Sequence, residues 1–148
     1  MAGAIDPAAR SRARRRALQA LYAWQLGGNR IESVIEQFCN EQDMRVADQE
    51  YFEILVRGVA RQRDELDAAI SPFLDRDITR VDPIELSALR IAAWELRERI
   101  DVPYRVVLNE AVESTKRFGA EHGHAYVNGV LDKLAAELRA AEYGAGRR

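Results

Sequence analysis

The feature that most constrains the fold of this chain is the spacing of its apolar residues, which recur every three to four positions along most of the sequence. That spacing gathers them on one face of an α-helix, and no segment shows the strict alternation of a half-buried strand. Ile31, Val34, Ile35 and Phe38 form one such face within a short segment. The sequence therefore predicts an all-α protein.

Capping and turn residues divide this pattern into about seven helices. Asp6-Pro7 and Asp82-Pro83 each combine an N-cap carboxylate with a proline at the first helical position, and Gly27-Gly28 ends the first helix. The other expected helices lie at 31–38, 48–70, 73–78, 103–119 and around 127–138. A seam near residues 70–82 then separates two packed helical bundles, approximately 10–70 and 71–140, within one domain. Residues 1–9 and 141–148 are expected to be flexible tails.

Composition excludes several classes of protein. The 148 residues are 47% hydrophobic and 31% charged, which is typical of a globular chain that buries a core. No run approaches the roughly 20 apolar residues of a membrane span, and the charged N-terminus lacks the apolar stretch of a secretory signal. Cys39 is the only cysteine, so no intramolecular disulfide can form, which fits a reducing cytoplasm. Trp24 and Trp94 are expected in the core because each belongs to an apolar helical face.

Positive charge is concentrated in an arginine cluster near the N-terminus, formed by Arg10, Arg12, Arg14, Arg15 and Arg16. Only one acidic residue opposes the cluster in the first sixteen positions, and residues 17–148 hold 17 basic and 23 acidic side chains, a net charge of −6. A basic segment on an acidic body predicts an anionic partner at one end of the molecule. Within the helix, no carboxylate follows any of the five arginines by one turn.

The helical geometry of the arginine cluster predicts how it is displayed. The apolar stripe through Ala17, Leu21 and Trp24, projected back along the helix, meets Arg14 and then Arg10. Because a guanidinium cannot be buried without a partner, the helix is expected either to fray before Ala17 or to project beyond the bundle. Replacing Arg14, Arg15 and Arg16 by alanine is then expected to leave helicity and melting nearly unchanged.

Charge alone leaves three interpretations of the cluster open: a solvated basic tail, a nucleic-acid-binding segment, or a contact with an acidic protein or membrane surface. Forked guanidiniums bind phosphate oxygens and stack on exposed bases. This chemistry favours single-stranded RNA, since no second helix completes a recognisable DNA-reading unit. A membrane is disfavoured because the segment lacks a bulky apolar face. If all five arginines contacted RNA phosphates, the log–log salt dependence would have a slope of roughly −3.5.

Other candidate chemistry is sparse. His122 and His124 have no third and fourth ligand at a recognisable spacing, so neither a metal site nor a cofactor is predicted. Glu110, Glu113 and Asp132 stand where solvated helix charges usually stand, and nothing pairs them with a nucleophile. The sequence contains no phosphate-binding loop and no dinucleotide-binding glycine motif. An enzyme is therefore not predicted.

Tyr126 and Asn128 lie near the start of the last long helix, off its apolar stripe. A tyrosine ring offers a stacking face for a base, and a side-chain amide can hydrogen-bond to one. Packing at the rim of the core explains both residues equally well. Gly129 weakens a helix interior relative to alanine, which predicts a close backbone contact with a neighbouring helix.

Three segments resemble the NusB family: RRRALQALYAWQ at 14–25, VLNEAVE at 107–113 and YVNGVLDKL at 126–134. The resemblance runs from about Arg10 to Leu138. It implies an all-α fold of two packed bundles, and binding to the boxA element of nascent ribosomal RNA together with the ribosomal protein that doubles as NusE. Such a protein acts as a transcription antitermination factor beside RNA polymerase and other Nus factors.

The resemblance also implies which residues form these contacts. RNA is expected at the arginine cluster and at the start of the last helix, which also brings in Gln19, Tyr22, His122 and Tyr126. The protein partner is expected on the fourth and fifth helices, where Glu85 aligns with an interface glutamate of the family. The chain departs from the family pattern at His122, where many relatives have an acidic residue, and at Tyr126, where phenylalanine is common.

Two further interpretations accompany this resemblance. A similar domain occurs in ribosomal RNA cytosine methyltransferases, but the sequence has neither a catalytic cysteine motif nor a glycine-rich cofactor loop. The alternative function is a protein-only helical scaffold without specific RNA binding, which direct RNA titration distinguishes from an RNA-binding factor. The sequence leaves open whether the chain is a monomer or a symmetric homodimer that covers its arginines.

Overall fold

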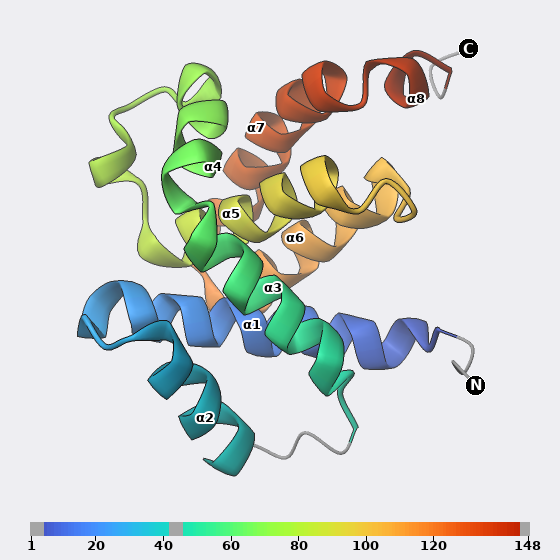
Figure 1. Ribbon diagram of the computed structural model, residues 1–148. Helices are drawn as coiled ribbons and strands as arrows, with labels where there is room; N and C mark the ends of the chain where they lie inside the picture. Colours follow the sequence, from blue (N-terminus) through green and yellow to red (C-terminus); the bar gives the residue numbers. More distant parts are fainter. Residues whose placement is uncertain (1–4, 42–45, 146–148) are drawn as a thin grey trace.

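A computed structural model describes residues 5–41 and 46–145 of the chain, and within them it confirms the all-α prediction. Eight α-helices and two 3₁₀ turns are present in these residues, and there is no strand (Figure 1). The helices are α1 (Pro7–Gly27), α2 (Ile31–Glu41), α3 (Gln49–Arg61), α4 (Arg63–Ile70), α5 (Pro83–Glu98), α6 (Tyr104–Phe118), α7 (Gly123–Leu138) and α8 (Ala140–Ala145). The 3₁₀ turns are η1 (Ser71–Phe73) and η2 (Ile78–Arg80).

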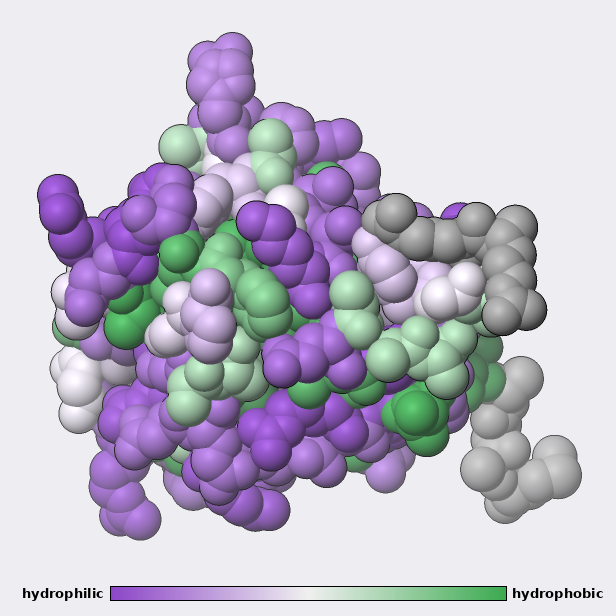
Figure 2. Space-filling view, turned by 90° about the horizontal axis from the view of Figure 1, so that it is seen from above, coloured by the Kyte–Doolittle hydropathy of each residue, from purple (hydrophilic) through white to green (hydrophobic). Residues whose placement is uncertain are grey.

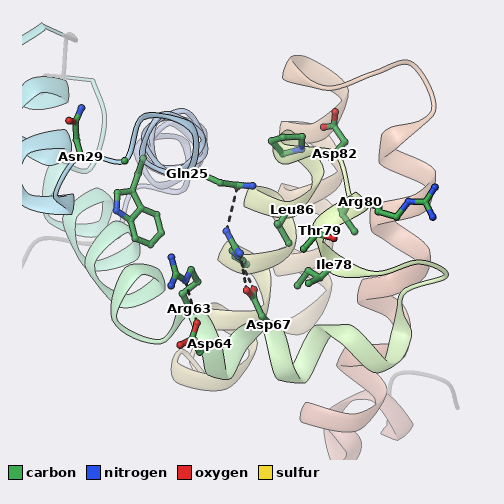
Figure 3. Close-up of a pocket in the computed structure, with 15 residues that line it drawn as sticks. Gln25, Asn29, Arg63, Asp64, Asp67, Ile78, Thr79, Arg80, Asp82 and Leu86 are labelled. Atoms are coloured by element: carbon green, nitrogen blue, oxygen red, sulfur yellow. Dashed lines mark hydrogen bonds and ion pairs between the residues drawn. The ribbon is translucent and has the colours of Figure 1, made fainter.

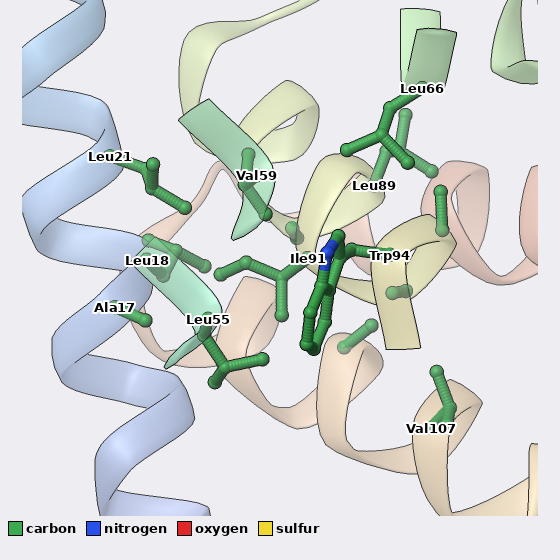
Figure 4. Packing of buried hydrophobic residues seen from close by; sticks show 14 of the residues in the cluster. Ala17, Leu18, Leu21, Leu55, Val59, Leu66, Leu89, Ile91, Trp94 and Val107 are labelled. Atoms are coloured by element: carbon green, nitrogen blue, oxygen red, sulfur yellow. The ribbon is translucent and has the colours of Figure 1, made fainter. Parts of the chain in front are cut away.

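The central element is α5, which packs against α1, α3, α4, α6 and α7 (Figure 1). Every residue from Glu85 to Leu96 is buried, so this helix contacts protein on all sides. Helices α1, α2 and α3 pack together in the first half of the chain, and α5, α6 and α7 pack together in the second. The buried residues of both halves form one contiguous hydrophobic cluster, to which α1 contributes Ala17, Leu18 and Leu21 (Figure 4).

The helix boundaries agree with the predictions where local capping sets them. The Asp6 carboxylate accepts hydrogen bonds from Ala8 N and Ala9 N, and Asp82 caps α5 in the same way. The expected helix at 48–70 is instead divided at Gln62 into α3 and α4, and the expected short helix at 73–78 is replaced by η1 and η2. The expected tails are helical where they are described, since α1 begins at Pro7 and α8 spans Ala140–Ala145; residues 1–4 and 146–148 lie outside the described residues.

Trp94 is buried in the core (Figure 4), and its indole packs against Gly58 of α3. A methyl group on Gly58 would lie 2.4 Å from the Trp94 indole, so α3 needs glycine at this point. Trp24 is only half-buried and lines a groove at the C-terminal end of α1. Hydrophilic side chains cover most of the face seen in Figure 2, with small apolar areas between them. None of the described helices has the length and apolarity that crossing a membrane requires.

Candidate nucleic-acid interface

The arginine cluster lies on a continuous helix that belongs to the body of the protein. Both Ala13 and Arg14 are buried, and α1 contacts α3, α5 and α6. The prediction that the helix frays or projects before Ala17 is therefore wrong. The reason is that several of its arginines find partners on other helices.

Arg14 is the clearest case, since it is only 5% exposed. Its Nε and Nη2 atoms donate to the Glu95 carboxylate at 2.9–3.1 Å, and Glu110 Oε1 lies 3.7 Å from its Nη1. Burial lowers the pKa of Arg14, but the hydrogen bonds and charge of Glu95 leave it above its usual value. Tyr51 donates its hydroxyl hydrogen to the same carboxylate at 2.5 Å. Arg14 therefore finds on α5 the carboxylate that its own helix lacks, and the pair joins α1 to α5.

The neighbouring arginines are also held by the fold. Arg10 Nε lies 3.6 Å from Asp48 Oδ2, and the guanidinium stands 4.0 Å from the centre of the Tyr51 ring. Arg12 Nη1 donates to the Val46 carbonyl oxygen at 2.9 Å. Arg16 is half-buried and is not free of interactions either. These contacts fasten the first turns of α1 to the segment that precedes α3.

Arg15 is half-buried like Arg12 and Arg16, but it differs from Arg10, Arg12 and Arg14 in its electrostatic surroundings. Burial lowers its pKa, and the like charges of Arg117, Arg12 and Arg16 lower it further. Among the described residues no carboxylate lies within ion-pair distance of Arg15. The one acidic residue that favours its charge, Glu110, already accepts a hydrogen bond from the Ser11 hydroxyl at 2.5 Å.

We define the Arg15 patch as Arg12, Arg15, Arg16 and Arg117. Arg117 comes from the last turn of α6, and sequence reasoning missed it. The available signal was its spacing, because Arg117 stands two helical turns beyond Glu110 and so shares the face of α6 that meets α1. Excess like charge on two packed helices attracts an anionic polymer. Gln19 and Tyr22 continue the Arg15 side of α1 by one and two turns, and both are half-buried.

The start of α7 carries the remaining expected RNA residues. His122 is exposed at the N-cap position and makes no capping hydrogen bond with its side chain. Tyr126 is half-buried, and the Arg76 guanidinium stands 4.5 Å from the centre of its ring. Burial raises the pKa of the Tyr126 phenol, and the Asp75 carboxylate beside it adds to the effect. One face of this expected stacking platform is thus already covered by Arg76.

Glu85, the expected partner-interface residue, is only 7% exposed. Its carboxylate lies against Gly123, where an added methyl group would be 2.9 Å from Glu85 Oε2. Burial raises the pKa of Glu85, Asp82 raises it further, and Arg76 opposes both. Within the free chain this side chain supports the first turn of α7, and its role in a protein interface stays a prediction.

A groove lies at the C-terminal end of α1, between α4, η2 and α5 (Figure 3). It has a volume of about 820 Å³, and Trp24 lies in its wall with the Arg63 guanidinium 5.5 Å from the ring centre. Arg90 forms two hydrogen bonds of 2.8 Å to Asp67 in the lining. The rim alternates charges of both signs, including Asp64, Arg80 and Asp82. Such a surface suits a polar protein segment better than a polyanion.

The remaining polar candidates form hydrogen bonds or ion pairs within the chain. Glu110 bonds to Ser11, Asp132 accepts from the Tyr143 hydroxyl at 3.0 Å, and Glu113 lies 3.5 Å from Lys116. In the part of the chain that the structure describes, no three His, Cys, Asp or Glu side chains gather closely enough to hold a metal ion. The predicted close approach at Gly129 is wrong, because an added methyl group there would meet nothing within 4 Å.

The helical fold and the Arg15 patch define a class: a small all-α protein with a surface suited to an anionic polymer. Comparison with known families identifies which one, because the NusB family model matches residues 11–136. This chain belongs to the NusB family.

Relatives of known sequence agree over nearly the whole chain. A transcription antitermination protein NusB of Xanthomonas campestris pv. campestris is 62% identical over 141 residues, which cover 95% of this chain and 89% of that protein. The protein of the same name from Stenotrophomonas maltophilia is 59% identical over 140 residues, covering 95% and 88%.

Solved structures share the fold. The crystal structure of antitermination factors NusB and NusE in complex with dsRNA superimposes with a TM-score of 0.76 at 29% identity, covering 91% of this chain and 96% of the solved chain. NusB of T. maritima superimposes with a TM-score of 0.79 at 28% identity and the same coverage.

Proposed function

We propose that this chain is a transcription antitermination factor that binds boxA RNA of nascent ribosomal RNA transcripts together with NusE. In this role it joins an RNA polymerase-associated complex with other Nus factors, acts in the cytoplasm and catalyses no reaction. The names of its relatives and the solved complex of NusB, NusE and RNA support the proposal. The single observation that carries it is the Arg15 patch, where like charges of α1 and α6 lie near one another and the one carboxylate that favours the charge of Arg15 is already engaged with Ser11.

The proposed mechanism divides affinity from selectivity. The Arg15 patch supplies affinity by neutralising phosphates, and the start of α7 reads bases. We place the protein partner on the surface between α4 and α5, where the groove beside Trp24 offers charges of both signs. Because Arg14 is committed to Glu95, fewer phosphate contacts are available than the five that the sequence predicts.

The salt dependence of RNA binding tests this assignment. With about three phosphate contacts, the log–log slope is expected near −2, or roughly a twentyfold loss between 50 and 200 mM salt. Arg15→Ala and Arg117→Ala should each flatten the slope by about 0.7 without changing the melting temperature. The measurement is fluorescence anisotropy with boxA RNA and a scrambled RNA over a salt series.

The control for this experiment is Arg61→Ala, because Arg61 is an exposed arginine in the last turn of α3 and lies outside both the Arg15 patch and the groove beside Trp24. It should leave the slope unchanged. Equal slopes for wild type, Arg15→Ala and Arg117→Ala would remove the Arg15 patch from the RNA interface. A wild-type protein that binds neither RNA would favour the protein-only scaffold instead.

Tyr126→Ala tests the reading role of α7. Stacking of a base on an aromatic ring contributes about 1–3 kcal/mol, and since Arg76 already covers one face we expect the lower end, roughly a tenfold loss of boxA affinity. Scrambled RNA should lose much less. A titration in which both RNAs weaken equally would show that Tyr126 does not read sequence.

A further inference from the structure

A second groove runs between α6 and α7, on the side of α7 away from Tyr126. It has a volume of about 460 Å³ and is lined by Tyr104, Arg105, Leu108, Asn109, Asn128, Asp132 and Tyr143. Residues two positions apart on a helix point about 200° apart, so Tyr126 and Asn128 cannot face the same ligand atom. The groove is therefore a separate surface from the one that Arg76 covers.

The walls of the groove are held by contacts within the fold. The rings of Tyr104 and Tyr143 lie 5.4 Å apart, and the Tyr143 hydroxyl donates to Asp132 Oδ2 at 3.0 Å. Glu142 accepts a hydrogen bond from Tyr104 N at 2.8 Å, which fixes α8 against the start of α6. The Asp132 carboxylate is thus occupied, and the groove does not present it as a bare negative charge.

Two side-chain amides in the lining make no hydrogen bond to the described residues. Asn109 on α6 and Asn128 on α7 are both exposed, and among the described residues neither side chain has a hydrogen-bond partner. Each amide carries two donors and one acceptor oxygen, the set that pairs with the edge of a nucleobase. Arg105 lies in the same lining, one turn before Asn109, with its guanidinium 5.8 Å from the centre of the Tyr104 ring.

Gly129, the residue after Asn128, is not in the lining, but it stands three residues before Asp132 and so borders the groove on α7. Gly129 weakens α7 relative to alanine, yet the space around it is open and no neighbouring helix requires a glycine. Asparagine is also a poor helix former in this position. The fold gains nothing from either residue, whereas an outside molecule that approaches the α7 backbone gains from both.

We propose that the groove between α6 and α7 binds a single-stranded RNA nucleotide, with Asn109 and Asn128 hydrogen-bonding to the base edge and Gly129 allowing close approach. This inference rests on the proposed function, since it adds a second base-reading site to the RNA-binding surface. The two amides, which have no hydrogen-bond partner among the described residues, favour a nucleotide over an apolar protein segment. The groove holds one nucleotide in volume, and its polar lining matches a base more closely than a hydrophobic side chain.

The test uses the full chain, boxA RNA and scrambled RNA. Asn109→Ala and Asn128→Ala should each weaken boxA binding roughly five- to tenfold and leave scrambled RNA unaffected. The salt slope should not change, because a neutral amide displaces no counterions. Asn40→Ala, which removes an exposed amide from α2, is the matched control and should change neither affinity.

Gly129→Gln separates a binding role from a structural one. The substitution should raise the melting temperature, since glutamine is a better helix former and nothing obstructs its Cβ, while it weakens boxA binding. Loss of both stability and binding would overturn the proposal. So would asparagine variants that bind boxA RNA as wild type does, or variants that lose only binding to the NusE partner. If wild type itself fails to distinguish boxA from scrambled RNA, the proposed function fails first.

Discussion

Glu95→Gln is expected to lower the free energy of unfolding by about 3–5 kcal/mol, because it leaves the Arg14 guanidinium buried without its charge partner. Glu95 is 1% exposed and accepts hydrogen bonds from Arg14 and Tyr51. The guanidiniums of Arg10 and Arg99 also lie 4.0 and 5.1 Å from the Tyr51 ring centre. Removing the carboxylate charge leaves three cations around one tyrosine.

Urea unfolding measures this loss, and a melting shift on the order of 10 °C should accompany it. Arg14→Met combined with Glu95→Met removes both charges, so it should recover most of the stability that the single substitution loses. Glu32→Ala is the control, because it breaks the exposed pair between Glu32 and Arg57 and should change the free energy of unfolding little. If Glu95→Gln is as stable as Glu32→Ala, the ion pair between Arg14 and Glu95 does not stabilise the fold.

This prediction changes how the arginine cluster must be tested. Replacing Arg14, Arg15 and Arg16 together would unfold or weaken the protein through Arg14, and any loss of RNA binding would be ambiguous. The sequence predicted that such a variant melts normally, whereas the buried pair to Glu95 predicts that it does not. Single substitutions at Arg15 and Arg117 avoid the difficulty, because neither forms an ion pair among the described residues.

Local chemistry explains which parts of the fold could be predicted from the sequence. Gly28 adopts a φ of 71°, which favours glycine, and it ends α1 where the sequence places the boundary. Asp48 caps α3 through Tyr51 N, again as the pattern predicts. The division at Gln62 could not be predicted, because neither glycine nor proline marks it and the packing of α3 and α4 against α5 determines the bend.

The candidate site was harder to predict because its decisive contacts are distant in the sequence. Helical projection correctly placed Arg14 on the buried stripe, but its partner Glu95 lies 81 residues away, so a frayed helix seemed necessary. Arg117 was missed for the same reason, since only the packing of α6 against α1 brings it near Arg15. The prediction at Gly129 was wrong for a different reason. A glycine inside a helix suggests a close neighbouring helix, but an added methyl group at Gly129 would meet no atom within 4 Å.

Arg139 is a second arginine whose partners lie far away in the sequence. At the end of α7 its sequence position suggests a solvated charge, yet the residue is only 3% exposed. All five of its N–H groups donate: to the carbonyl oxygens of Glu95, Leu96, Arg99 and Val102, and to the Glu142 carboxylate. These carbonyls belong to the end of α5 and the turn after it. Glu95 O also accepts from Arg99 N, and Arg99 O from Val102 N, so the Leu96 and Val102 carbonyls depend most on Arg139.

Arg139→Ala is therefore expected to lower the free energy of unfolding by about 3–5 kcal/mol, since the Leu96 and Val102 carbonyls lose their donor and each such loss costs about 1–3 kcal/mol before water enters. Arg139→Lys should recover only part of the loss, because an ammonium group has three donors and cannot form the planar fork. Arg97→Ala removes an exposed arginine from the same end of α5 and should cost less than about 1 kcal/mol. Urea unfolding compares the three variants, and hydrogen exchange of the 99–102 amides should accelerate only where Arg139 is changed. If Arg139→Ala is no less stable than Arg97→Ala, the end of α5 is held by its own turn and water, and Arg139 does not connect α7 to it.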